Sequence, residues 1–195
     1  MLLTQHAVSY IELRRFPEAL RKLDEVSNII PDDIDILMLK AAVAQAEGDL
    51  PRASAILARL HPRAENNQAL ETQVYQAILE RRPEPIIPRL KEVLGNPDPE
   101  LGHVNGQLRF WLGWAQDVAG DHAAAWESWQ QTRRELEGFL NEQPENDKLI
   151  GDLALTNMGL GDKAAALALA ERTLSAHSTK KDALTDQCRS RFSPG

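Results

Sequence analysis

The chain has 195 residues, of which 22 are basic and 29 acidic, and its formal net charge is −7. Nucleic-acid-binding proteins usually carry a basic excess, so we expect no nucleic-acid partner. One cysteine cannot form an internal disulfide or a zinc site with two thiolates. No apolar run approaches the roughly 20 residues of a membrane span, and the first residues do not resemble a signal peptide. We therefore expect a cytoplasmic protein without membrane insertion.

The apolar residues follow a helical period. Within residues 52–60, for example, Ala53, Ile56, Leu57 and Leu60 fall on one helical face. No alternating stretch is long enough for a strand, so the sequence predicts an all-α fold.

Small residues recur along the chain in pairs that are 12 residues apart. The pairs are Ala7 with Ala19, Ala41 with Ala53, Gly113 with Ala125, and Ala154 with Ala166. A turn position lies five residues before the second member each time: Arg14, Gly48, Gly120 and Gly161. An Asp follows each of these glycines and suits the cap of a second helix. Four residues after the second member, a side chain that can fill the core is expected: Leu23, Leu57, Trp129 and, more weakly, Ala170. This spacing predicts antiparallel helix pairs.

These pairs resemble tetratricopeptide (TPR) repeats, whose pattern of about 34 residues runs W-x2-L-G-x2-Y, A-x3-F, P. The first pair supplies Leu3, Ala7, Tyr10, Ala19, Leu23 and Pro31, and Ala19 and Ala53 are one family period apart. The resemblance implies a right-handed α-solenoid of about five helix pairs plus a terminal helix. We expect a single domain over 1–195, with repeats at 1–32, 33–65, 66–97, 98–144 and 145–178.

Two parts of this array are less regular. In the divergent repeat 66–97 we expect helices over 67–82 and 84–95, but Arg89, not a small residue, stands 12 after Ala77. An inserted helix pair is the alternative there. Residues 179–192 carry an apolar stripe (Leu184, Cys188 and Phe192) and are expected to form a terminal helix or the start of a truncated repeat.

The sequence contains no arrangement that suggests catalysis. Its five histidines lack metal-ligand spacing, no glycine-rich phosphate loop is present, and no acid, base and nucleophile come together. We therefore expect a non-enzyme without a cofactor or metal.

The TPR resemblance implies that the first helix of each pair lines a concave groove. In the assigned frame the groove residues are Met38, Gln45, Phe110, Trp114, Asp117, Leu155 and Met158. Burial between repeats is the alternative for the apolar ones. The Lys and Asn of repeats that clamp a C-terminal carboxylate are missing from these positions, so that mode of binding is not expected.

These features predict a protein–protein interaction scaffold that holds a partner protein or peptide segment in the groove. Two alternatives are a regulatory or sensory TPR region of a larger bacterial protein, such as a transcription regulator or cyclase, and self-association through the repeat ends.

Overall fold

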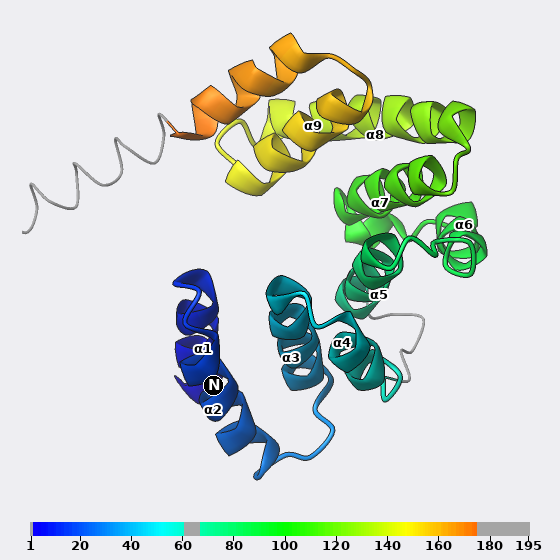
Figure 1. Cartoon of the computed structure of the whole chain (residues 1–195). Coiled ribbons are helices and arrows are strands. Elements are labelled where there is room, and N and C mark those ends of the chain that lie inside the picture. Colours follow the sequence, from blue (N-terminus) through cyan, green and yellow to red (C-terminus); the bar gives the residue numbers. More distant parts are fainter. Residues whose placement is uncertain (1, 61–66, 175–195) are drawn as a thin grey trace, which may run out of the picture. The chain divides into compact units, whose positions relative to one another are not determined.

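The computed structural model describes residues 2–60 and 67–174, and within these ranges every regular element is a helix (Figure 1). Contacts divide the chain into two compact units, Met1–Gly95 with Val118–Gly120 and Asn96–Asp117 with Asp121–Gly195. The all-α prediction is confirmed. The expected terminal helix at 179–192 lies outside the described residues.

The first unit contains three helix pairs. Their bounds are α1 (Leu2–Glu12) and α2 (Phe16–Ser27), α3 (Ile34–Glu47) and α4 (Leu50–Leu57), and α5 (Asn67–Leu79) and α6 (Ile87–Gly95). The second unit begins with a short 3-10 helix, η1 (Pro99–Leu101), and continues with α7 (Val104–Val118), α8 (His122–Glu142) and α9 (Asp147–Gly159). A further helix begins at residue 163 and is described as far as 174.

The predicted turns have one common backbone geometry. Gly48, Gly120 and Gly161 all adopt positive φ, the conformation in which glycine ends a helix without steric cost. The aspartate after each glycine accepts a hydrogen bond from a backbone N–H in the first turn of the next helix. Arg14 takes the same positive φ in the first pair, where a proline in the first turn helps start α2.

The middle pair has this turn as well. Arg81 has a φ of 56°, and the N–H of Arg82 donates to the carbonyl of Ala77 at 2.9 Å. The N–H of Asp49 donates to the carbonyl of Ala44 at the same distance, and the turns at residues 15, 121 and 162 contain the corresponding bond. Counting from this turn, the pairing residue is Val74, three residues before Ala77, and it is fully buried. Three prolines follow the turn within residues 83–88, and α6 starts only at Ile87.

The small residues lie where helices meet. Ala7, Ala19, Ala41, Ala53 and Ala125 are each fully buried. The core position four residues later is also buried at Leu23, Leu57 and Trp129. The weaker prediction of Ala170 is wrong, because that side chain is exposed and Leu169 packs against the neighbouring core instead.

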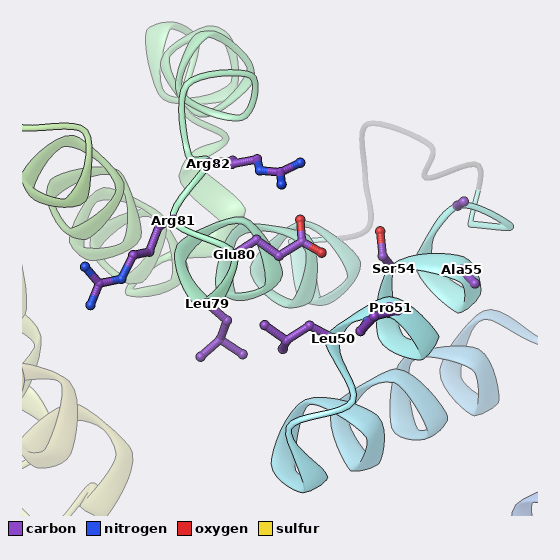
Figure 2. A pocket seen from close by; sticks show the side chains of 9 residues that line it. Leu50, Pro51, Ser54, Ala55, Leu79, Glu80, Arg81 and Arg82 are labelled. Carbon is purple, nitrogen blue, oxygen red and sulfur yellow. The ribbon is translucent and has the colours of Figure 1, made fainter.

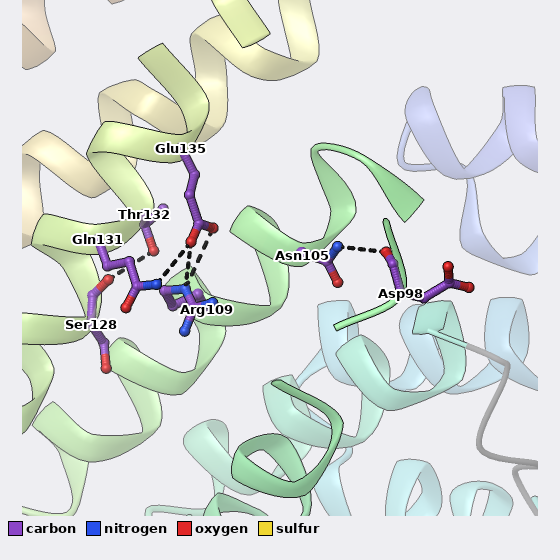
Figure 3. A network of polar contacts seen from close by, with 7 residues as sticks. All are labelled: Asp98, Asn105, Arg109, Ser128, Gln131, Thr132 and Glu135. Carbon is purple, nitrogen blue, oxygen red and sulfur yellow. Dashed lines mark hydrogen bonds and ion pairs between the residues drawn. The ribbon is translucent and has the colours of Figure 1, made fainter. Parts of the chain in front are cut away.

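In the second unit α8 is a long helix that packs against both α7 and α9. Leu136 and Leu140 of α8 form a core with Leu149, Ile150 and Leu153 of α9. On the other side the Arg109 Nε of α7 donates to Glu135 Oε1 of α8 at 3.2 Å (Figure 3). None of the described helices is long and apolar enough to cross a membrane.

Candidate functional site

An apolar pocket of about 280 Å³ lies in the second unit between the first helices α7 and α9. Its lining residues are Phe110, Trp114 and Asp117 of α7, Trp129 of α8, and Leu155, Met158 and Gly159 of α9. Five of the seven sequence-predicted groove residues are therefore gathered around one pocket. We call this region the α7–α9 seam.

The predicted residues on α7 and α9 share faces because of their helical spacing. Phe110, Trp114 and Asp117 are related by steps of four and three residues, as neighbours on one face of a helix are. Leu155 and Met158 are likewise three residues apart, and their side chains are 53% and 52% exposed. Two large apolar side chains are thus exposed to solvent beside an apolar pocket.

Trp129 lines the pocket from α8 and is only 7% exposed. Its indole Nε1 donates to the carbonyl of Phe110 at 3.3 Å. A Cβ at Gly113 would come within 2.6 Å of Trp129 Nε1, and one at Gly159 within 2.6 Å of Cδ2 of the same indole. The two glycines therefore admit the ring between α7 and α9, where any larger residue would collide with it.

Trp114 is half-buried and packs against the aromatic rings of its own helix. Its indole stacks on Trp111 at 5.4 Å between centroids with an interplanar angle of 11°, and it is tilted against Phe110 at 5.9 Å. Such pairs contribute roughly 0.5–1.5 kcal/mol beyond the area they bury. The Trp114 side chain is thus held in place while it lines the pocket.

Polar groups lie at both ends of the seam. At one end the Asp117 carboxylate lies at the pocket, with Oδ1 2.7 Å from Nδ1 of the exposed His122. At the other end Gln107 Nε2 of α7 donates to Asp152 Oδ2 of α9 at 2.6 Å. Burial raises the pKa of Asp152, while the hydrogen bond from Gln107 and the charges of Lys148 and His103 act in the opposite direction.

The remaining two predicted residues, Met38 and Gln45, lie on α3 in the first unit and are buried. Met38 is 5% exposed and packs with Leu37, Ala41 and Leu57. Gln45 is 8% exposed, and its Nε2 donates to two oxygens of α5, the Thr72 carbonyl at 3.2 Å and Gln76 Oε1 at 3.1 Å. We call this contact between first helices the α3–α5 seam, and neither residue lines the pocket between α7 and α9.

Sequence reasoning missed Gly159, Gln107 and Asp152. Gly159 is the last residue of α9, two residues before Gly161, the glycine that forms the turn. A glycine in a helix that the turn does not require was the one sequence feature that could have indicated a close contact here. Gln107 and Asp152 are 45 residues apart, and nothing in their local sequence couples them.

A second hollow, of about 700 Å³, lies in the first unit between α4 and the turn after α5 (Figure 2). Leu50, Pro51 and Leu79 give it apolar walls, and Arg81 and Arg82 stand at the turn that borders it. None of these residues is among the sequence-predicted groove residues. Among the described residues, no group of three or more His, Cys, Asp or Glu side chains is placed to hold a metal ion.

Comparison with known proteins adds information on the fold. Neither a family model nor a curated protein matches the chain. The structure is similar to that of MamA from Desulfovibrio magneticus RS-1 (residues 41 to the end), with a TM-score of 0.53, 19% identity, and coverage of 91% of this chain and 94% of that chain. It is also similar to MamA AMB-1, with a TM-score of 0.53, 19% identity, and coverage of 92% and 99%. The fold is a TPR-like helical solenoid.

Proposed function

We propose that this protein is a protein-interaction scaffold and that it holds a partner segment at the α7–α9 seam. One observation carries the proposal: residues of three helices surround an apolar pocket, and two of its large side chains, Leu155 and Met158, are more than half exposed. Aromatic side chains in such pockets often dominate the energy of protein interfaces. The TPR-like fold supports this role, since helical-repeat proteins use surfaces of this kind to bind segments of other proteins.

The pocket is small and has one charged group in its lining, which favours a single side chain of a protein partner over a metabolite. Sites for small molecules occupy about 300–1,000 Å³ and bury most of their ligand. The pocket lies just below this range and has a single carboxylate at its edge. It suits one large side chain presented by a longer segment, and we propose a role in binding, not in catalysis.

A selection of phage-displayed random peptides tests the proposal. We expect peptides that bind the unaltered chain to share a large apolar residue. Their affinity for Leu155→Arg should be at least tenfold lower, because the variant places a charged side chain at an apolar lining position of the pocket. Leu167→Arg is the matched control, because Leu167 is 63% exposed, lies on the helix from residue 163 and does not line the pocket. Selected peptides that bind both variants equally would contradict the proposal.

A further inference from the structure

The Gln107–Asp152 end of the α7–α9 seam has more hydrogen-bond acceptors than donors. Gln107 is 5% exposed, and its Oε1 is buried with no hydrogen-bond partner among the described residues. Its Nε2 already donates to Asp152 Oδ2. No described basic side chain lies within 4.0 Å of the Asp152 carboxylate. Gln107 Oε1 is enclosed, but the Asp152 carboxylate is only partly buried and can accept more than the one hydrogen bond from Gln107, so this end of the seam favours a ligand that brings N–H donors to Asp152.

This polar end continues the same seam as the pocket. Gln107 stands three residues before Phe110, and Asp152 stands three residues before Leu155, so each lies one helical turn from a pocket-lining residue on the same face. Asp117 lies at the opposite end, ten residues after Gln107. Ten helical residues span about 15 Å, so one carboxylate stands at each end of a short apolar stretch.

The charge of this part of the chain points to the same kind of ligand. Residues 96–174 contain six Lys and Arg against thirteen Asp and Glu, a net charge of −7, whereas residues 1–95 carry −2. Arg109 is one of those six, and it already pairs with Glu135. A basic segment would therefore be attracted to this region, and an acidic one repelled.

We propose that the occupant of the seam is a basic, amphipathic segment of a partner protein, with one large apolar anchor over Trp129 and a Lys or Arg on each side of it. One basic side chain pairs with Asp117, and the other donates to Asp152. The inference rests on the proposed function and adds the chemical class of the partner. If the segment is helical, the distances along α7 place one basic residue about one turn from the anchor and the other about two turns away on the opposite side.

Synthetic helical peptides provide the test. The first has a central Leu with Lys at four and seven residues on either side, so that it fits in both directions. The second has Glu at those four positions, and the third keeps the lysines but replaces the Leu with Ala. Binding to the full chain is measured by calorimetry at physiological salt. We expect the Lys peptide to bind at least tenfold more tightly than either of the others.

Protein variants assign this preference to the two carboxylates. The double variant Asp117→Asn/Asp152→Asn should bind the Lys peptide about tenfold more weakly, the equivalent of about 1.4 kcal/mol. Glu137→Gln/Glu142→Gln is the matched control, because both residues are exposed on α8, outside the pocket, and the pair removes the same charge. The control should lose less than twofold. An equal loss in the two double variants, or equal binding of Lys and Glu peptides, would overturn the inference.

One further variant separates this inference from the proposed function. If Leu155→Arg abolishes binding of every Leu-anchored peptide while Lys and Glu peptides bind the unaltered chain equally, the pocket is a docking site and the basic partner is refuted. If the Lys peptide binds Leu155→Arg as well as it binds the unaltered chain, the pocket itself is refuted. Failure of the Lys peptide to bind the unaltered chain would refute the basic partner alone.

Discussion

The α3–α5 seam and the α7–α9 seam are built on the same repeat frame but end differently. Counted from the small residue of the first helix, Met38 corresponds to Phe110 and Gln45 to Asp117. Gln45 donates to two oxygens of α5, and this closes the first seam with buried polar bonds. Asp117 instead faces His122 across the turn after α7 and accepts no hydrogen bond from α9 among the described contacts.

The residue types at equivalent positions of the repeat account for this difference. Between these two positions stands Ala42 in α3 and Trp114 in α7. In the first seam, the small side chain of Ala42 and the amide of Gln45 are compatible with direct contact between α3 and α5. A tryptophan and a carboxylate leave a hollow beside the exposed Leu155 and Met158. Four predictions test whether the two seams differ in this way.

The largest effect is expected at Trp129, the buried tryptophan of the α7–α9 seam. Replacing Trp129 with Ala removes a nearly buried indole that packs against two glycines, and should lower the free energy of unfolding by about 3–5 kcal/mol. Trp126→Ala is the control on the same helix, because Trp126 is 50% exposed and should cost under about 1 kcal/mol. Urea unfolding followed by circular dichroism measures both. Equal costs would show that Trp129 does not support the seam.

The second effect concerns the glycine that admits this ring. A Cβ at residue 159 would come within 2.6 Å of the Trp129 indole, so Gly159→Ala should cost about 1–3 kcal/mol through overpacking. A Cβ at Gly151, on the same helix, meets nothing within 4 Å, and Gly151→Ala should instead stabilise α9 by up to about 1 kcal/mol. Thermal melts of the two variants should therefore shift in opposite directions. A shift in the same direction would mean that the indole has room to move.

The glycines at the turns show how far the sequence predicts the structure. Gly48, Gly120 and Gly161 could be placed at turns because a helix end in the left-handed region favours glycine, and the next Asp is a helix cap. Arg14 and Arg81 adopt the same conformation without that residue type. The Arg81 turn has neither Gly nor a following Asp, so the sequence does not reveal it, and counting from Ala77 leads to Arg89 in place of a small residue.

The site was predictable only where it follows helical periodicity. Phe110, Trp114, Asp117, Leu155 and Met158 were placed by their offset from Gly113 and Ala154, and the structure brings them around one pocket. The burial of Gln45 depends on Thr72 and Gln76, which approach it from a different helix. A periodic pattern gives the direction of a side chain on its own helix. It does not say whether the next helix covers that side chain.

A third prediction concerns the α3–α5 seam. Gln45→Ala removes the two hydrogen bonds from α3 to α5 and should lower the free energy of unfolding by about 1 kcal/mol. Gln131→Ala serves as the control, because Gln131 is exposed and, among the described residues, its side chain bonds to Glu135 one turn along its own helix. We expect about 0.5 kcal/mol or less for the control. Hydrogen exchange of the α5 amides should rise in the Gln45 variant alone, and unchanged exchange would show that these bonds do not hold the seam closed.

An effect of similar size to that at Gln45 but of opposite sign is expected at Asp152. Because burial raises the pKa of this carboxyl, the folded chain binds more protons than the unfolded chain between the ordinary value of 3.8 and the raised one. The free energy of unfolding contributed by Asp152 therefore falls as the pH rises through that window.

Asp152→Asn has no charge to bury, keeps an oxygen for Gln107 Nε2 and adds an N–H that can donate to the unpartnered Gln107 Oε1. The variant should be more stable than the unaltered chain by about 1 kcal/mol at pH 7, a typical value for one hydrogen bond. The advantage should shrink as the pH falls below 4, because the carboxyl then becomes increasingly protonated in the unfolded as well as the folded chain. Urea unfolding at pH 7 and pH 3.5 measures the difference between the two proteins at each pH, so that the titration of the other carboxylates cancels. A destabilised variant at pH 7 would show that the carboxylate is already well satisfied within the chain, and would remove the reason for expecting a basic partner at this end of the seam.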